Sequence, residues 1–200
     1  TVQGSLIGRR AAIYMSDNAY VKNITVDTGA HIEGDIINKW QYDDPDIGDK
    51  RMRRRLEGAP LPITTLTFAG QNLRYNGNID GSKNTRLVIS GNLSYGGKAD
   101  VLSAAVAPGG ALFGGHYRLY PAPDHTLSVS LAGELHTLAD VGVFTNRGLL
   151  APVGEPLTIE GDFVSRGALG LATDADGSAA HPIAVSGTAD VDGSTLTAVP

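Results

Sequence analysis

Five acidic side chains stand beside a glycine in short motifs of the sequence, and paired carboxylates held at a fixed separation can hydrolyse glycosidic bonds. They are Glu33, Asp35, Glu134, Glu160 and Asp162. If successive motifs stacked in register, these acids would line one edge of the fold. Elsewhere Asn76, Asn78 and Asn92 occupy equivalent places, and an amide cannot replace a catalytic acid. The pattern therefore favours a structural role, with a sugar-cleaving groove as the alternative.

The histidines are the next candidates for chemistry, and they are His31, His116, His125, His136 and His181. A serine hydrolase of the α/β type would show a Gly-x-Ser-x-Gly elbow, which this sequence lacks. A zinc site needs three or four protein ligands. Only His116 and His125 are close, nine residues apart, and no third ligand accompanies them. We therefore interpret the histidines as scattered surface and turn residues.

Two oxygen-rich segments resemble calcium-binding loops: "DDPDIGD" at 43–49 and "DADG" at 174–177. An EF-hand loop also requires further oxygen ligands and a closing glutamate, which "DADGSAAH" does not supply. Asp-Gly is a common turn pair, and the acids of the first segment are followed by arginines. We predict no metal and no other cofactor.

A charged segment, "WQYDDPDIGDKRMRRRLE" at 40–57, interrupts the apolar alternation of the chain. Basic clusters bind phosphates, acidic glycans or nucleic acids. Here an acidic run precedes the basic one, so self-neutralisation is the main interpretation and a partner role the alternative. The residues of this candidate interaction loop are Trp40, Lys50, Arg51, Arg53, Arg54 and Arg55.

The composition narrows the class of protein. A net charge of −5 argues against nucleic acid as a partner. The absence of cysteine excludes disulfides, thiolate metal sites and cysteine nucleophiles. Glycine supplies 26 of 200 residues without a collagen period, which suits short strands and many turns. No apolar run is long enough for a membrane helix, and the first ten residues do not resemble a signal peptide.

One five-residue pattern, apolar-x-Gly-[Asp/Asn/Glu]-apolar, recurs along the chain. It is found as "IEGDI" at 32–36, "YNGNI" at 75–79, "ISGNL" at 89–93, "LAGEL" at 131–135 and "IEGDF" at 159–163. A ligand site occurs once or twice in a chain, whereas a structural corner recurs, as in repeat architectures. Glycine permits a bend or a close approach of two backbones, and Asp or Asn suits a turn.

Short alternating segments surround these motifs, for example "TTLTF" at 64–68 and "TLSVSL" at 126–131. Such alternation predicts half-buried strands. Strand, bend and strand in repetition predict coils of short strands, each of which needs its neighbours to bury its inner face. "KADVLSAAVA" at 98–107 fits either a helix or two short strands, and "HYRLYPAPDH" at 116–125 predicts an irregular turn.

The order of these pieces resembles a known family. "AAIYMSDNAYVKNITVDTGAHIEGDIINKW" at 11–40, "LVISGNLSYGG" at 87–97 and "LTIEGDFVSRGALGLATDADGSAAHPIAVSGTADVDGSTLTAVP" at 157–200 are similar to the passenger of Gram-negative autotransporters, which use type V secretion. The stem of subtilisin-like autotransporter proteases is the most similar, and the tail resembles the autochaperone end of such passengers. The serine motif Gly-Thr-Ser-Met-Ala of those proteases is absent here, and so is the barrel that follows a passenger.

The resemblance implies an all-β fold, namely a right-handed parallel β-helix with a β-sandwich-like C-terminal cap. Residues 1–104 would form stem coils with a charged loop inserted at 40–62, and residues 105–200 the last coils and the cap. The residues expected in the core of the cap are Leu157, Ile159, Phe163, Leu169, Leu171, Ile183, Val185, Val191 and Leu196.

The resemblance also implies a place at the bacterial cell surface or outside the cell, reached through the outer membrane. The partners would be the C-terminal outer-membrane β-barrel translocator of the same polypeptide and a distal effector domain, such as a serine protease. We therefore expect a non-catalytic stem with a cap that promotes folding and secretion. The alternatives are an adhesin-type module that binds a host protein, a glycan or its own copies, and a carbohydrate-active enzyme built on the β-helix.

Overall fold

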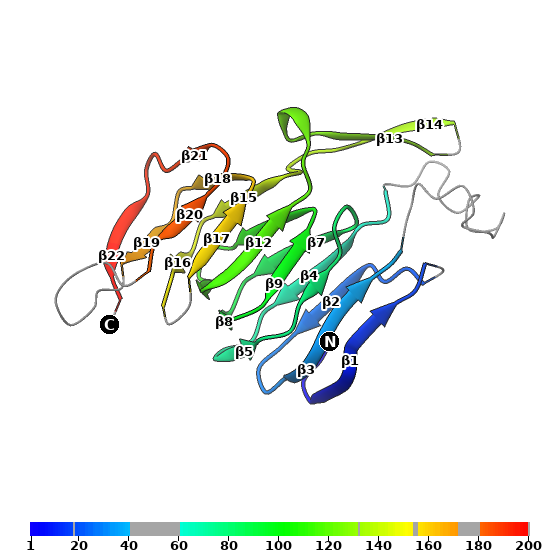
Figure 1. Cartoon of the computed structure of the whole chain (residues 1–200), viewed down its shortest axis with the longest axis horizontal. Helices are drawn as coiled ribbons and strands as arrows, with labels where there is room; N and C mark the ends of the chain where they lie inside the picture. The colour runs from blue at the N-terminus through cyan, green and yellow to red at the C-terminus, as the bar shows by residue number, and fades with distance from the viewer. Residues whose placement is uncertain (18, 41–60, 132, 154–155, 172–180, 200) are drawn as a thin grey trace.

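The computed structural model describes residues 1–200 except 18, 41–60, 132, 154–155, 172–180 and 200. In the described part the strands form three parallel sheets and one antiparallel hairpin, without an α-helix. Figure 1 shows the strands side by side along the long axis, with the blue N-terminal strands at one end and the red C-terminal strands at the other. The prediction of an all-β protein with parallel sheets is confirmed.

The first and second sheets have seven strands each. In spatial order the first sheet contains β1 (Ser5–Met15), β3 (His31–Asn38), β6 (Ile79–Asp80), β9 (Lys98–Val101), β12 (Gly115–Leu119), β17 (Leu157–Glu160) and β20 (Ile183–Val185). The second sheet contains β2 (Asn23–Val26), β4 (Thr64–Phe68), β7 (Thr85–Ile89), β10 (Ser103–Val106), β15 (Val143–Asn146), β18 (Asp162–Ser165) and β21 (Ala189–Asp190).

The third sheet has six strands, and the chain reaches the three sheets in a fixed rotation. The strands of the third sheet are β5 (Leu73–Tyr75), β8 (Asn92–Tyr95), β11 (Ala111–Phe113), β16 (Leu149–Ala151), β19 (Ala168–Leu171) and β22 (Thr195–Ala198). From β4 onward the chain visits the second sheet, then the third, then the first, and begins again, leaving this rotation only for the hairpin. Each circuit therefore adds one strand to every sheet.

Alternation decides which side chains enter the core. In β4 the buried positions are Thr64, Leu66 and Phe68, and the positions between them are half-buried. The parallel register places Leu66 beside Leu87 of β7, and Leu87 beside Ala104 of β10. Because successive side chains of a strand point to opposite faces, each circuit sends its apolar residues into one shared interior.

A column of aromatic rings runs through that interior. Neighbouring rings have centroids 5.1–6.0 Å apart, within the range of favourable aromatic pairs. The column consists of Phe68, Tyr75, Tyr95, Tyr117, Phe144 and Phe163. Each ring belongs to a different strand, so the column links successive circuits.

Glycines stack where the chain turns between sheets. A Cβ on Gly97 would lie 2.2 Å from the carbonyl oxygen of Gly77, and a Cβ on Gly77 would lie 2.4 Å from that of Gly34. Four of the five motif glycines stand at such close approaches: Gly34, Gly77, Gly91 and Gly161. The fifth, Gly133, precedes β14 in the hairpin and has open space around it. Gly77, Gly91 and Gly161 lie between strands of different sheets, whereas Gly34 lies inside β3, so the corner interpretation of the motif holds at three places and is wrong at Gly34 and Gly133.

Two segments left open or expected to be irregular are strands. Residues 98–107, which fitted either a helix or two strands, form β9 and β10. The predicted irregular turn at 116–125 is wrong for its first half, because His116–Leu119 continue β12 and pair with β9 and β17. A short 3-10 turn, η1 (Pro123–His125), then leads into the hairpin of β13 (Leu127–Leu131) and β14 (Glu134–Leu138).

The C-terminal strands continue the same three sheets. β17 and β20 extend the first sheet, β18 and β21 the second, and β19 and β22 the third. Among the described strands there is no separate sandwich after Leu157. The expected boundary between residues 104 and 105 falls inside β10. No helix in the described ranges is long and apolar enough to cross a membrane.

Candidate functional site

The acids and amides of the glycine motifs bind backbone of the next circuit. Asp35 Oδ1 accepts a hydrogen bond from the backbone N–H of Asn78 at 2.7 Å, and Asn78 Oδ1 accepts one from the N–H of Lys98 at 3.2 Å. Asp162 Oδ1 likewise accepts from Thr188 N–H at 2.6 Å. Both Asp and Asn offer a side-chain acceptor, which explains why either residue serves at this place.

The same geometry separates the acids that could have formed a catalytic pair. Glu33 lies on β3 and Glu160 on β17, with β6, β9 and β12 between them in the first sheet. At a strand spacing of about 4.8 Å these two residues are about 19 Å apart. Glycosidase carboxylates are separated by roughly 5–9.5 Å. Glu134 lies on the hairpin strand β14, away from both. Glu33, Glu134 and Glu160 therefore do not assemble into one catalytic edge.

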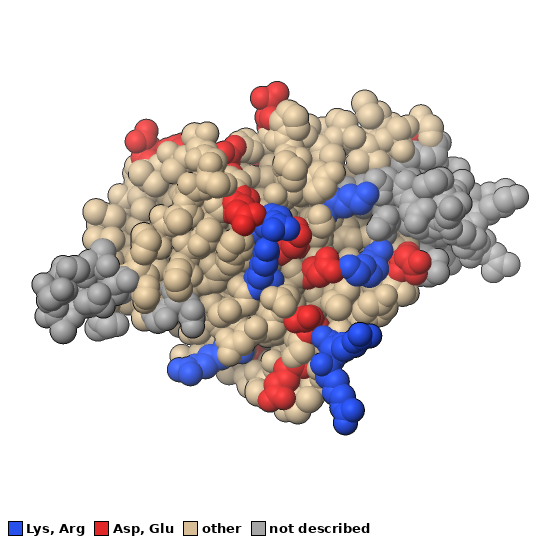
Figure 2. All heavy atoms as spheres, viewed as in Figure 1, with Lys and Arg blue, Asp and Glu red and all other residues tan. Residues whose placement is uncertain are grey.

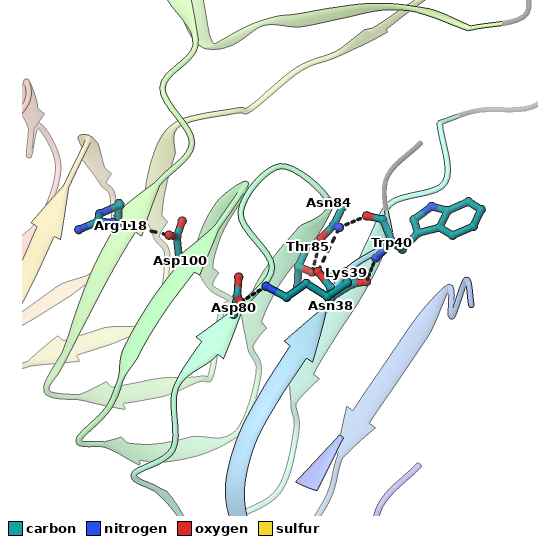
Figure 3. A network of polar contacts seen from close by, with 8 residues as sticks. All are labelled: Asn38, Lys39, Trp40, Asp80, Asn84, Thr85, Asp100 and Arg118. Atoms are coloured by element: carbon teal, nitrogen blue, oxygen red, sulfur yellow. Dashed lines mark hydrogen bonds and ion pairs between the residues drawn. The ribbon is translucent and has the colours of Figure 1, made fainter. Parts of the chain in front are cut away.

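Charged side chains instead form a charge ladder across the outer face of the first sheet, which we define as Lys39, Asp80, Asp100, Arg118 and Glu160. Lys39 Nζ pairs with Asp80 Oδ2, Arg118 Nη1 lies 3.7 Å from Asp100 Oδ2, and Arg118 Nε donates to Glu160 Oε2 at 3.0 Å. Figure 3 shows the first two pairs on neighbouring strands, and Figure 2 shows positive and negative groups next to each other on this face. Every contact of the ladder ties one circuit to another.

Glu160 is the most constrained carboxylate of the ladder. Besides the bond from Arg118, its Oε1 lies 2.7 Å from Nε2 of His116. The hydrogen bond from Arg118 is the main reason that the pKa of Glu160 lies below its usual value, with smaller contributions from His116. The group is therefore ionised at neutral pH and accepts from two side chains of β12.

Four of the five histidines lie beside carboxylates. His31 pairs with Glu33 at 2.8 Å, and His125 Nε2 lies 3.6 Å from Asp162 Oδ2. His136 lies 3.8 Å from Glu134 on the hairpin, and His181 is half-buried. His116 and His125 therefore have separate partners, Glu160 and Asp162. Within the described residues no group of three or more His, Cys, Asp or Glu is placed to hold a metal ion.

Trp40 lies at the base of the charged segment, fully buried at 1 % exposure, with its ring 5.7 Å from that of Tyr20. Asn38, two residues earlier, is also buried, and its Oδ1 accepts the backbone N–H of Trp40 at 3.1 Å. Asn84 Nδ2 donates to the carbonyl oxygen of Trp40 (Figure 3). Two asparagines therefore hold the backbone of Trp40, the last described residue before the gap at 41–60.

The amide of Asn38 also joins two further circuits. Its Nδ2 donates to Thr64 Oγ1 and to Thr85 Oγ1, both at 3.0 Å. Thr64 donates to Val21 O at 2.8 Å, and Thr85 donates to Asn84 Oδ1 at 3.0 Å. Sequence reasoning missed this network. The signal it left is a polar residue at an inward position of an otherwise apolar strand, as at Asn38 and Thr64.

A second buried asparagine, on β15, also joins neighbouring circuits. Asn146 Nδ2 donates to Ser165 Oγ at 3.1 Å and to Ala168 O at 3.0 Å, and its Oδ1 accepts from Gly148 N–H at 3.1 Å. Asn146 and Ser165 face each other in the parallel register of β15 and β18. Buried polar groups are costly unless paired, and each of these has its partner in the next circuit or corner.

The residues expected in the core of the cap divide into three groups by burial. Leu157, Ile159 and Phe163 are buried. Leu169, Ile183 and Val185 are partly buried and pack against the core. Leu171, Val191 and Leu196 are exposed at 47 %, 46 % and 71 %, which differs from the expected core position. Of the nine expected residues, the first two groups therefore lie in or against the interior of the stack.

Some sequence candidates lie outside the described residues. These are Lys50, Arg51, Arg53, Arg54 and Arg55 of the candidate interaction loop, and both oxygen-rich segments, at 43–49 and 174–177. Of that loop only Trp40 belongs to the described part.

A shallow cavity of about 340 Å³ lies over the second sheet. Its floor is made of small and β-branched side chains, including Val88, Ala105 and Thr145, and Arg86, Arg147 and Asp140 also line it. Arg86 already donates to the carbonyl oxygen of Ala139 at 2.6 Å, which attaches the end of the hairpin to β7. Neither a histidine nor a glutamate lines this cavity, so it brings together no pair of groups for acid–base chemistry.

The charge ladder, the motif aspartates and the buried asparagines bind one circuit to another, and most of their polar atoms take part in these contacts. Comparison of the chain with protein-family models, with curated proteins and with solved structures found no match.

Proposed function

We propose that this chain is a right-handed parallel β-helix that forms the stem and the folding cap of an autotransporter passenger. The observation that carries the proposal is the fixed rotation of the chain through three parallel sheets, one strand per sheet in each circuit. A stack of this kind is a spacer: it grows along one axis and holds apart what is attached to its two ends.

The contacts between circuits support the proposed role as a stem. The aromatic column, the asparagine networks and the charge ladder each connect a strand to its neighbour in the next circuit. Repeat stacks gain their stability from such nearest-neighbour interfaces, so folding can start at one place and propagate. A stem that winds up circuit by circuit fits a chain that emerges progressively from a membrane pore.

The proposed cap holds buried apolar residues on β17 and β18, and each of these strands pairs with one later strand. Ile159 on β17 pairs in register with Val185 on β20, and Phe163 on β18 pairs with Ala189 on β21. Arg166 binds Asp190 through two bonds, Nη1 to Oδ1 at 3.0 Å and Nη2 to Oδ2 at 2.5 Å. These contacts join the last circuits into a unit that we propose as the folding seed.

The experiment that tests the proposal compares residues 1–200 with residues 103–200, a fragment that begins at the first residue of β10. Both are unfolded with urea and followed by circular dichroism. We expect the fragment to fold alone, with a β spectrum and a midpoint at least as high as that of the whole chain. If the fragment is unfolded while the whole chain melts as one unit, the C-terminal end is not a seed and the cap proposal fails.

A matched pair of variants tests the role of the cap in secretion. The whole chain is placed between a reporter domain and an outer-membrane barrel, and surface display is measured. Ile159→Asn puts a polar group in the core, whereas Thr158→Asn changes the neighbouring half-buried position. We expect display to fall for the first variant and to stay near the parent level for the second. Equal display of both variants would count against a folding cap.

A further inference from the structure

β1 carries a large bulge on the outer face of the first sheet. Ile7 pairs with Glu33 and Ala11 pairs with Asp35, so three residues of β1 stand opposite the single residue Gly34. The backbone folds tightly there, because a Cβ on Gly8 would lie 1.9 Å from the carbonyl oxygen of Ala11. Bulges of this kind re-aim side chains and are frequent beside functional sites.

The bulge presents two adjacent cations. Arg9 and Arg10 are both exposed. Neither guanidinium has an ion pair or a hydrogen bond in the part of the chain that the structure describes, in contrast to Arg118 and Arg166, which hold carboxylates. Two like charges side by side repel each other, so the protein gains from an anion that binds both.

A shallow, open surface pocket of about 530 Å³ lies beside these arginines. We call it the bulge pocket, and the residues that line it are Arg9, Arg10, Ala11, Tyr14, Asp35 and Ile37. Tyr14 is 62 % exposed, so the pocket contains a large aromatic ring that the core does not use. Ile37 is half-buried and adds apolar surface.

The remaining wall is a carboxylate with a fixed position. Asp35 Oδ1 accepts the backbone N–H of Asn78 at 2.7 Å, which holds the side chain in place. Oδ2 has no hydrogen-bond partner within the described ranges, and a carboxylate oxygen is a strong acceptor for hydroxyl groups. The pocket therefore combines two cations, an aromatic face and a hydroxyl acceptor.

We propose that the bulge pocket binds an acidic oligosaccharide. The arginines take its carboxylate or sulfate groups, since guanidinium matches planar and tetrahedral oxyanions in two-point bonds. The ring of Tyr14 packs against the apolar C–H face of a sugar ring, and Asp35 accepts from a sugar hydroxyl. A simple phosphate would use the arginines alone and would leave Tyr14 and Asp35 without a role. This site is independent of the stem function proposed above.

Calorimetric titration tests the proposal with three probes on the whole chain: a heparin tetrasaccharide, tetragalacturonate and neutral cellotetraose. The test variant is Arg9→Gln/Arg10→Gln. The control variant is Arg74→Gln/Arg147→Gln, which removes the same charge from two exposed arginines outside the pocket. Circular dichroism checks that all variants keep the parent fold. Tyr14→Ala is measured as a third variant.

We expect at least one acidic probe to bind and cellotetraose not to bind. The test variant should weaken binding about tenfold or more, because charge-assisted hydrogen bonds are lost, and the control should change it less than about twofold, because distant exposed charges are screened by salt. Tyr14→Ala should also weaken binding. Heparin binding without tetragalacturonate binding assigns the site to sulfated sugars, and the converse assigns it to uronic acids.

Three results would overturn the proposal. The first is that neither acidic probe binds the parent chain. The second is equal weakening by the test and the control variants, which would indicate diffuse attraction to net charge. The third combines two observations: Tyr14→Ala leaves oligosaccharide binding unchanged, and the chain binds vesicles containing phosphatidylglycerol equally well through Arg9 and Arg10. That result would indicate that the pocket binds an anionic membrane surface instead.

Discussion

The phenol ring of Tyr95 stacks on that of Tyr75, with centroids 5.7 Å apart and planes at 12°. The two hydroxyl groups have different surroundings. Tyr75 Oη lies 3.0 Å from the carbonyl oxygen of Gly34 and 2.9 Å from that of Asn78. The hydroxyl of Tyr95 is buried, and among the described residues it has no hydrogen bond of ordinary distance and angle, the backbone of Ile79 being its nearest polar contact. Burial raises the pKa of both phenols, so both are neutral at physiological pH.

This difference predicts different results for the same substitution at the two positions. Tyr75→Phe removes a hydrogen bond to corner backbone and should lower the free energy of unfolding by about 1 kcal/mol. Tyr95→Phe removes a buried hydroxyl without a well-formed hydrogen bond, and should leave that free energy unchanged or raise it slightly. Urea unfolding of the two variants beside the parent checks this. A loss for Tyr95→Phe as large as that for Tyr75→Phe would contradict it.

The glycine corners make a second prediction. A Cβ on Gly97 would lie 2.2 Å from Gly77 O and 2.9 Å from the ring of Tyr95. Gly97→Ala must therefore push two circuits apart or displace the aromatic column, and we expect a loss of about 2–3 kcal/mol. Gly4→Ala is the control, since nothing lies within 4 Å of its added Cβ. If both variants unfold at the same urea concentration, the corners are not closely packed.

Much of this fold could be predicted from local pattern. Alternation of apolar and small polar residues marks β4 and β7 because a half-buried strand needs it. The recurring glycine beside Asp or Asn marks corners because only glycine allows the close backbone approach at Gly77 and Gly91. The pattern could not show that these corners differ. Gly91 lies between the second and third sheets, whereas Gly161 lies between the first and second.

What could not be predicted depends on register between distant residues. Asn38 bonds Thr64 and Thr85, which are 26 and 47 residues away. Nothing in the neighbourhood of Asn38 shows which circuit will face it. Leu196 was expected in the cap core because the alternating pattern predicts a strand there. Burial also requires another part of the chain to cover the side chain, and Leu196 is 71 % exposed.

The bulge pocket was missed for a similar reason. "GRR" at 8–10 reads as part of an ordinary strand end, and its two extra residues become visible only when β1 is aligned with β3. The charged segment at 40–57 can be identified from the sequence because it is a run of charges. Two arginines in a strand are common, and they suggest a binding site only when the structure shows that no carboxylate is bonded to them.

The asparagine network gives a third prediction. Asn38→Ala removes the donor to two threonine hydroxyls and the acceptor of Trp40 N–H, all of them buried. We expect the free energy of unfolding to fall by about 2–3 kcal/mol, because buried groups left without partners keep their desolvation cost. Fluorescence of Trp40, the only tryptophan, should report the change, since Asn38 and Asn84 hold its backbone.

Asn76→Ala is the matched control, because Asn76 is exposed and the structure shows no hydrogen bond of its side chain among the described residues. It should unfold within about 0.5 kcal/mol of the parent, as surface substitutions usually do. A similar loss for both asparagines would mean that the network adds nothing beyond ordinary amide solvation.

The fourth prediction concerns pH and Glu160. The pKa of Glu160 is lowered in the folded chain, mainly by the hydrogen bond from Arg118. Between the folded and the unfolded pKa the unfolded chain therefore binds more protons. The stabilisation is present above the unfolded pKa, ordinarily about 4.3, and is lost as pH falls through the lower folded value. Glu160→Gln should lower the urea midpoint at pH 7 and lower it much less near pH 3.

The stabilisation from the ion pair of Arg118 and Glu160 is limited because solvent screens it: the two side chains are 49 % and 38 % exposed. Ion pairs as exposed as this one contribute little to stability. Glu33→Gln is the control, because Glu33 pairs with His31 on its own strand and joins no circuits. If Glu160→Gln and Glu33→Gln shift the midpoint equally at pH 7, the charge ladder does not hold circuits together. If the shift of Glu160→Gln persists undiminished at pH 3, its cause is packing of the side chain and not its charge.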